Sequence, residues 1–130
     1  MEYIVNSLKD RNLKVTPQRV AIARTIQKHG HIDIDKLYQT IQKEFPSISL
    51  ATLYKNINSF LEKGFIREIA IPNHKSKYEL VEKSHAHFIC TRCGKVEDLE
   101  IDIEKLKNSI QERRERIEGV SLSFYGICCN

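Results

Sequence analysis

Apolar residues recur at helical spacing through the first half of the chain. Thr16 precedes a proline and has the form of a helix N-cap, and Asp33 or Asp35 can start another helix. Ser49 can cap a fourth helix, which Gly64 is placed to end. The pattern predicts four helices before residue 65, with these apolar stripes: Ile4, Val5 and Leu8; Val20, Ala23 and Ile26; Leu37, Tyr38, Ile41 and Phe45; and Leu53, Ile57, Phe60 and Leu61.

The pattern changes to short strand-like runs after residue 64. Residues 65–70 and 77–81 flank a turn-like segment at 72–75 that contains proline and asparagine, which predicts a β-hairpin. Helices followed by a hairpin are the order of a winged helix, in which the second helix of a helix-turn-helix enters the DNA major groove. We therefore expect residues 1–83, including a hinge, to form a winged-helix DNA-binding domain.

The expected recognition helix begins at Ser49. Its polar side chains can bind phosphates or base edges, although any solvated helix presents a similar face. The formal net charge of +4 is concentrated before residue 85, which is typical of a protein with a polyanionic partner. The candidate DNA-binding residues on this helix are Ser49, Thr52, Tyr54, Lys55 and Asn56.

The remaining residues, 84–130, read as a separate unit. They predict strands at 87–90 and 96–100, a charged helix at 103–118 and a last strand at 120–128. A unit of this size buries little apolar surface alone, so we expect metal binding and self-association to stabilise it. The fold class is therefore α+β, a winged helix-turn-helix domain followed by a small α/β dimerisation domain.

The cysteines of this second unit favour a structural zinc site. Cys90 and Cys93 form a C-x-x-C motif followed by a glycine, which suits half of a tetrahedral zinc site. The other half is expected near Cys128, and Cys129 is a possible fourth ligand, unless the site is closed by another residue or the chain given is truncated. A thiol oxidoreductase is a competing interpretation, but this motif precedes a strand-like run and not the helix of a βαβ unit.

A second candidate metal site combines nitrogen and oxygen ligands. His85 and His87 alternate along a strand and therefore point to one face, where Glu79 and Asp98 could add carboxylates. Such a donor set suits Fe(II) or Mn(II), with Zn(II) as a competitor. Either His29 or His31 could add a ligand from the first domain, whereas His74 in the hairpin turn is expected to be solvated.

The composition and the motifs that the sequence lacks argue against several classes of protein. The 130 residues are 41% hydrophobic and contain no apolar run of the roughly eighteen residues that a membrane span needs. The N-terminal residues do not have the form of a signal peptide, so we expect a cytoplasmic protein. The sequence also has no phosphate-binding glycine loop, G-x-S-x-G or H-E-x-x-H motif, so we do not expect an enzyme.

The residues quoted above also match a known family across nearly the whole chain. The sequence resembles the ferric uptake regulator family of bacterial metal-dependent repressors. The matching stretches are LKVTPQR at 13–19, HIDIDKLY at 31–38, SLATLYKNINSF at 49–60, KYELV at 77–81, HAHFICTRCGKVEDLE at 85–100 and FYGIC at 124–128. The resemblance implies a homodimer that binds double-stranded operator DNA, with a structural zinc and a regulatory metal near the hinge.

The resemblance also implies roles for individual residues. It implies DNA contacts by Lys14 in the minor groove and by Tyr54 and its neighbours, with Arg19 as a DNA-backbone candidate. The structural zinc ligands would include Cys90, Cys93 and Cys128. The implied ligands of the regulatory metal are His31, Glu79, His85, His87 and Asp98.

Residues between and near the paired histidines in the sequence indicate the branch of the family. Iron-sensing members usually carry a second site with an acid between these histidines, whereas this chain has Ala86. Peroxide-sensing members lack that site and have an aspartate at the position of Asp98, although they have an aspartate where this chain has Glu79. We expect a peroxide-sensing repressor in which bound iron promotes oxidation of His31 or His85. An iron-sensing repressor and a zinc-stapled interaction module are the alternatives.

Overall fold

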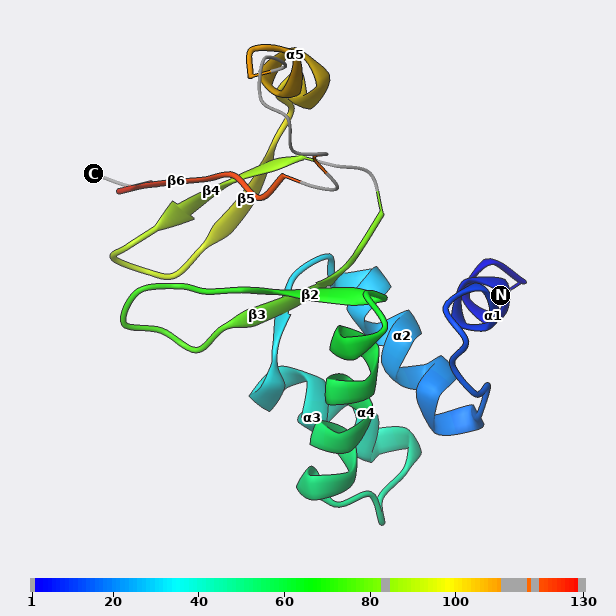
Figure 1. Ribbon diagram of the computed structural model, residues 1–130. Coiled ribbons are helices and arrows are strands. Elements are labelled where there is room, and N and C mark those ends of the chain that lie inside the picture. Colours follow the sequence, from blue (N-terminus) through cyan, green and yellow to red (C-terminus); the bar gives the residue numbers. More distant parts are fainter. Residues whose placement is uncertain (1, 83–84, 111–116, 118–119, 129–130) are drawn as a thin grey trace. The chain divides into compact units, whose positions relative to one another are not determined.

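The chain folds into two units (Figure 1). The computed structural model describes all residues except 1, 83–84, 111–116, 118–119 and 129–130. The first unit comprises Met1–Ala70 and Lys75–Val81, and the second comprises Ile71–His74 and Glu82–Asn130. Both contain helices and strands, so the expected α+β class is confirmed. In the described ranges no helix combines the length and apolar character that a membrane crossing requires.

Four helices build the first unit, as predicted. Each of the last three begins at a side chain that accepts a hydrogen bond from a backbone N–H: Thr16 from Arg19 at 3.1 Å, Asp33 from Lys36 at 2.9 Å and Ser49 from Thr52 at 3.1 Å. Asp33, and not Asp35, therefore caps the third helix. The helices are α1 (Glu2–Asp10), α2 (Pro17–His29), α3 (Ile34–Glu44) and α4 (Leu50–Glu62).

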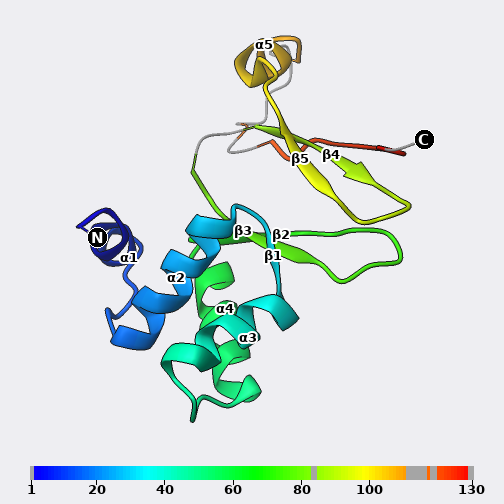
Figure 2. The ribbon, with the colours of Figure 1, turned by 180° about the vertical axis from the view of Figure 1, so that it is seen from behind.

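A three-stranded antiparallel sheet completes this unit, with the strand order β1-β3-β2. Strands β2 (Ile66–Ile69) and β3 (Lys77–Leu80) form the predicted hairpin. Strand β1 (Ile32–Asp33) was not predicted, because two residues show no periodicity and only their pairing with β3 defines them as a strand. Figures 1 and 2 show α3 and α4 as a helix-turn-helix with the hairpin as its wing.

The interior of the first unit is one continuous apolar cluster. Phe60 of α4 is fully buried and packs edge-to-face on Phe65, with ring centroids 4.9 Å apart. Leu53 and Ile57 share its face of α4 and are also fully buried. Burial of this face fixes the rotation of α4, so the opposite face of the helix points to solvent.

A second sheet organises the other unit. Its order is β5-β4-β6, where β4 (Ala86–Cys90) pairs antiparallel with β5 (Val96–Leu99) and parallel with β6 (Ser123–Gly126). The last strand is therefore shorter than the predicted 120–128. Strand β4 has only five residues, and its pairing with β6 gives it hydrogen-bonding partners along its second edge.

The charged helix predicted at 103–118 is described only in its first part. Helix α5 spans Ile103–Asn108 and is followed by a turn at 109–110, while most of the remaining prediction lies outside the described residues. Ile103 is the only buried side chain of α5, and Ile110 is 45% exposed. Within the described residues, α5 therefore rests on the rest of the unit mainly through Ile103.

We predict that Phe60→Ala destabilises the first unit strongly. Deleting a fully buried phenylalanine side chain costs about 3–5 kcal/mol of unfolding free energy, through lost transfer energy and a residual cavity. Urea denaturation followed by far-ultraviolet circular dichroism measures this change. Lys43→Ala, on an exposed position of α3, is the matched control, and a similar free energy for both variants would contradict the packing described.

Candidate metal centres and recognition helix

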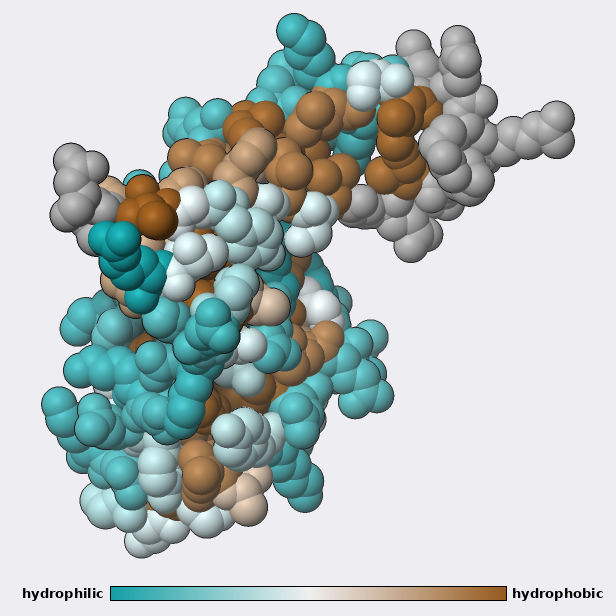
Figure 3. All heavy atoms as spheres, turned by 90° about the vertical axis from the view of Figure 1, so that its left-hand side faces the viewer, coloured by the Kyte–Doolittle hydropathy of each residue, from teal (hydrophilic) through white to brown (hydrophobic). Residues whose placement is uncertain are grey.

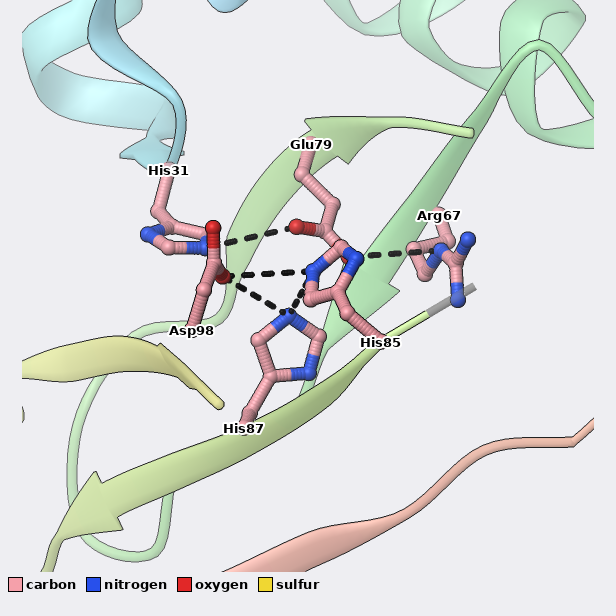
Figure 4. A network of polar contacts seen from close by, with 6 residues as sticks. All are labelled: His31, Arg67, Glu79, His85, His87 and Asp98. Atoms are coloured by element: carbon pink, nitrogen blue, oxygen red, sulfur yellow. Dashed lines mark hydrogen bonds and ion pairs between the residues drawn. The ribbon is translucent and has the colours of Figure 1, made fainter. Parts of the chain in front are cut away.

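Two histidines of the second unit point to one side of strand β4. His85 and His87 are two residues apart, so the alternation of side chains puts both imidazoles on the same face. Asp98 is the antiparallel partner of His87 on β5. The two Nε2 atoms lie 2.9 Å apart, and Asp98 Oδ1 lies 3.2 Å from Nε2 of His85 and 3.5 Å from Nε2 of His87 (Figure 4). Two nitrogens and one oxygen therefore converge.

This convergence has the chemistry of a metal site. Two imidazole nitrogens at hydrogen-bond distance share one proton, because one ring must donate and the other accept. A divalent cation can replace that proton and take both lone pairs, with the carboxylate as an anionic ligand. The donor set of His85, His87 and Asp98 fits Fe(II), Mn(II) or Zn(II).

The first unit holds a buried carboxylate, Glu79 of β3, which is 4% exposed. Its Oε1 lies 3.3 Å from Nε2 of His31, and its Oε2 lies 3.3 Å from Nε of Arg67 (Figure 4). Arg67 is directly opposite Glu79 on β2. Opposite charges on facing positions of a hairpin commonly pair, so the register of the predicted hairpin could have revealed Arg67.

The predicted regulatory ligands thus fall into two groups, one within each unit. His85, His87 and Asp98 form the group of the second unit, and His31 and Glu79 form that of the first. His29, the alternative to His31, is exposed at the end of α2, where its Nδ1 lies 3.0 Å from the carbonyl oxygen of Thr25.

The second unit also gathers three cysteine sulfurs, those of Cys90, Cys93 and Cys128, within 4.8 Å of one another. The Sγ atoms of Cys93 and Cys128 are 3.5 Å apart. The backbone N–H groups of Cys128 and Cys93 each donate to Cys90 Sγ at 3.4 Å, and together they lower the pKa of the Cys90 thiol to about 6. Three converging sulfurs, one of them stabilised as a thiolate, fit a tetrahedral zinc site. Cys129 lies outside the described residues.

His74 packs against this cysteine knuckle, contrary to the expectation that it is solvated. Gly94, directly after Cys93, has φ +81°, and a Cβ atom built there would lie 3.0 Å from the His74 ring. The histidine is half-buried and its Nε2 atom is fully buried. The turn after Cys93 therefore requires glycine for two reasons, the backbone conformation and the approach of the imidazole.

The exposed face of α4 differs from the one predicted from residue types. Ser49 caps the helix and donates to Thr52 Oγ1 at 2.9 Å, and Asn56 donates to the carbonyl oxygen of Thr52 at 3.1 Å. Tyr54 is 40% exposed, and Leu50, one turn earlier, is 43% exposed. Six residues form this exposed face: Leu50, Ala51, Tyr54, Lys55, Asn58 and Glu62.

Arg19 links α4 to the segment before α2 through two hydrogen bonds. Its Nε donates to Asn56 Oδ1 at 3.0 Å, and its Nη1 donates to the carbonyl oxygen of Lys14 at 3.2 Å. Lys14 itself is exposed. Of the predicted DNA-binding residues, Lys14, Ser49, Tyr54 and Lys55 are solvent-exposed, whereas Arg19 and Asn56 form a hydrogen bond with each other.

The comparison with protein families decides the classification. The model of the ferric uptake regulator family matches residues 10–125 of this chain. The chain belongs to this family. The resemblance seen in the sequence is therefore confirmed, and the family's two-part architecture agrees with the two units.

Individual relatives resemble the chain over almost its whole length. The peroxide-responsive repressor PerR of Staphylococcus aureus is 32% identical, covering 98% of this chain and 88% of the relative. The crystal structure of the Campylobacter jejuni peroxide stress regulator is 37% identical, with a TM-score of 0.81 and coverage of 98% and 97%. A zinc-bound manganese uptake regulator is 29% identical, with a TM-score of 0.71 and coverage of 97% and 98%.

We predict that Gly94→Ala weakens retention of the structural metal. A side chain at φ +81° costs about 1–2 kcal/mol, and its contact with the His74 ring adds to this cost. Zinc release to a chelator, followed with a colorimetric dye, measures the effect. Gly30→Ala is the matched control, since Gly30 has φ +76° with no atom within 4 Å of the added Cβ.

The contact with His74 can be separated from backbone strain. If it matters, His74→Ala should partly restore zinc retention in the Gly94→Ala background. Equal zinc release by wild type and Gly94→Ala would contradict the role given to this turn.

Proposed function

We propose that this protein is a metal-dependent transcriptional repressor that binds operator DNA as a homodimer and responds to peroxide. The observation that carries the proposal is the convergence of His85, His87 and Asp98 in a chain whose other unit is a winged helix. Relatives named for peroxide responses in Staphylococcus aureus and Campylobacter jejuni support the choice of branch. Operator binding in bacteria implies a cytoplasmic location.

The regulatory metal would be Fe(II) or Mn(II), held by His85, His87 and Asp98 together with His31 and Glu79. Because these ligands come from both units, full coordination would restrict how the units are oriented. A cation that binds this arrangement more tightly than others shifts the population toward it. A tenfold preference contributes only about 1.4 kcal/mol, so an effective switch needs a larger difference. The proposed result is a spacing of two winged helices that fits successive operator half-sites.

The structural zinc would be held by Cys90, Cys93 and Cys128, with Cys129 as the proposed fourth ligand. Thiolate ligands suit a zinc that stays bound, and the zinc would close the end of β4 onto the segment after β6. The alternative of a thiol oxidoreductase is disfavoured because Cys90, the residue with the lowered pKa, is fully buried. A nucleophilic thiolate needs access to its substrate.

The second unit would also form the dimer. Strand β6 pairs on one side with β4 and is at the end of the strand order, so it is an edge strand. Three large apolar side chains on or beside it are about half exposed: Phe124, Tyr125 and Ile127. Figure 3 shows hydrophobic side chains gathered over the strands of this unit. Burial of these side chains against a second copy would remove them from water.

Peroxide sensing would follow from iron at this centre. Bound Fe(II) supplies the reactivity toward peroxide. The ring of His31 or His85 would gain one oxygen atom from hydrogen peroxide, and the other oxygen would leave as water. A ligand is thereby lost irreversibly, and the metal-dependent DNA complex would dissociate.

Mass spectrometry tests peroxide sensing. In iron-loaded protein treated with hydrogen peroxide, the peptide containing His31 or His85 should gain about 16 Da, the mass of one oxygen atom. We expect about one such addition per chain. Manganese-loaded protein should gain none under the same conditions. Absence of added oxygen on both histidine peptides of the iron form would leave an iron-sensing or manganese-sensing repressor.

His85→Ala tests the regulatory site directly. Loss of one ligand should reduce the Mn(II)-dependent gain in operator affinity by at least about tenfold, because ligand losses weaken metal sites by one or more orders of magnitude. The structural zinc content and the dimer should be unchanged. His29→Ala is the matched control. A retained metal response in His85→Ala would contradict the ligand assignment. DNA affinity of the wild type that does not depend on salt concentration would favour an interaction module over a repressor.

The exposed face of α4 would read the operator in the major groove. Leu50 and Ala51 are apolar, and apolar side chains discriminate bases through the thymine methyl group. Tyr54 and Lys55 can add contacts to base edges and phosphates. Lys14 would add a minor-groove contact, with Arg19, Ser49, Thr52 and Asn56 as supporting residues.

Removing thymine methyl groups tests this assignment. Replacing thymines one at a time by deoxyuridine in a family-type palindromic operator should weaken wild-type binding about three- to tenfold at the position read by Leu50. Leu50→Ala should bind the thymine and uracil operators equally at that position. Asn58→Ala is a control on the same face. An unchanged uracil penalty in Leu50→Ala would contradict the proposed contact.

A further inference from the structure

Arg67 gives the buried Glu79 carboxylate a permanent positive partner. Its Nε lies 3.3 Å from Oε2, while the other oxygen, Oε1, lies 3.3 Å from Nε2 of His31. Glu79 is 4% exposed and the Arg67 side chain is 25% exposed, so both charges are partly or wholly removed from water. The two carboxylate oxygens therefore have different partners: a guanidinium on one side and an imidazole on the other.

Each partner constrains what Glu79 can do. A buried carboxylate without a countercharge is costly, and a guanidinium supplies that charge because it stays protonated in proteins. The guanidinium faces Oε2, whereas Oε1 faces the imidazole of His31, the other proposed metal ligand of this unit. A divalent cation arriving at Oε1 meets a carboxylate that is already neutralised, and the two positive charges repel each other across it.

We infer that Arg67 sets the metal concentration at which the protein responds, by stabilising Glu79 in the metal-free state and competing electrostatically with the incoming cation. This inference rests on the proposed function, since it assumes that Glu79 is a ligand of the regulatory metal. Arg67 is a positioning residue and is not itself a ligand, because a guanidinium has no lone pair to offer.

Removal of the charge should tighten metal binding. Full-length protein with its structural zinc retained is titrated with Mn(II) against a competing chelating dye. In Arg67→Gln the dissociation constant should fall about three- to tenfold, because a repelling charge beside the site is gone. Arg67→Lys keeps the charge and should stay within about twofold of wild type. Arg67→Met, which is neutral and fills similar space, should agree with Arg67→Gln.

A surface arginine of the same unit provides the matched control. Arg24 is exposed on α2, so Arg24→Gln removes one solvated positive charge and should leave the dissociation constant unchanged. Thermal unfolding gives a second measurement. Metal-free Arg67→Gln should melt below wild type, since Glu79 loses its partner, and Mn(II) should raise its melting temperature by more than it raises that of wild type.

The outcomes separate this inference from the proposed function. Wild-type protein that binds no Mn(II) outside the cysteine site would contradict the proposed regulatory site itself. Wild type that binds Mn(II), with equal or weaker binding by Arg67→Gln and Arg67→Met, would contradict the role of Arg67 alone. Tighter binding by Arg24→Gln as well would show an effect of net charge and would also overturn the inference.

Discussion

Strand β4 is the element on which both metal groups of the second unit depend. Its antiparallel pairing with β5 puts Asp98 opposite His87, and its parallel pairing with β6 puts Gly126 beside Cys90. The first ladder assembles nitrogen and oxygen ligands at the start of the strand. The second brings Cys128 toward the knuckle at its end. A slip of one residue in either ladder would turn the relevant side chains to the opposite face and separate the ligands.

The two groups differ in chemistry in a way that suits two different roles. Sulfur ligands, which Cys90 and Cys93 would provide, suit a metal that belongs to the folded structure, and backbone N–H groups stabilise the charge on Cys90. Imidazole and carboxylate ligands bind Fe(II) or Mn(II) more weakly, so occupancy can follow the metal supply. In the proposed mechanism the first metal maintains the unit, and the second decides whether DNA is bound.

Much of the fold was predictable because local signals determine it. Thr16 and Ser49 cap helices as their sequences predict, and the C-x-x-C motif reads as a knuckle from spacing alone. Strand β1 was missed because only its partner β3 defines it. Of the helix predicted at 103–118, the described part is Ile103–Asn108, and most of the rest lies outside the described residues.

The sites were less predictable than the fold, because they depend on side-chain contacts between residues that are distant in the sequence. Sequence chemistry selected Asn56 as a DNA-binding residue, and only the structure shows that its Oδ1 accepts a hydrogen bond from Arg19, on another helix. Leu50 was passed over because an apolar residue in a helix is usually buried, and only the rotation of α4 exposes it. Arg67 required the register of β2 and β3, which spacing alone does not fix.

The central claim is that His31 of the first unit and two histidines of the second, His85 and His87, bind the same metal ion. Electron spin echo spectroscopy of the Mn(II)-loaded, zinc-containing dimer tests it directly, because the modulation depth counts imidazole nitrogens bound to the ion. The account predicts three such nitrogens in wild type and two in His31→Ala. An identical count in wild type and His31→Ala would contradict it.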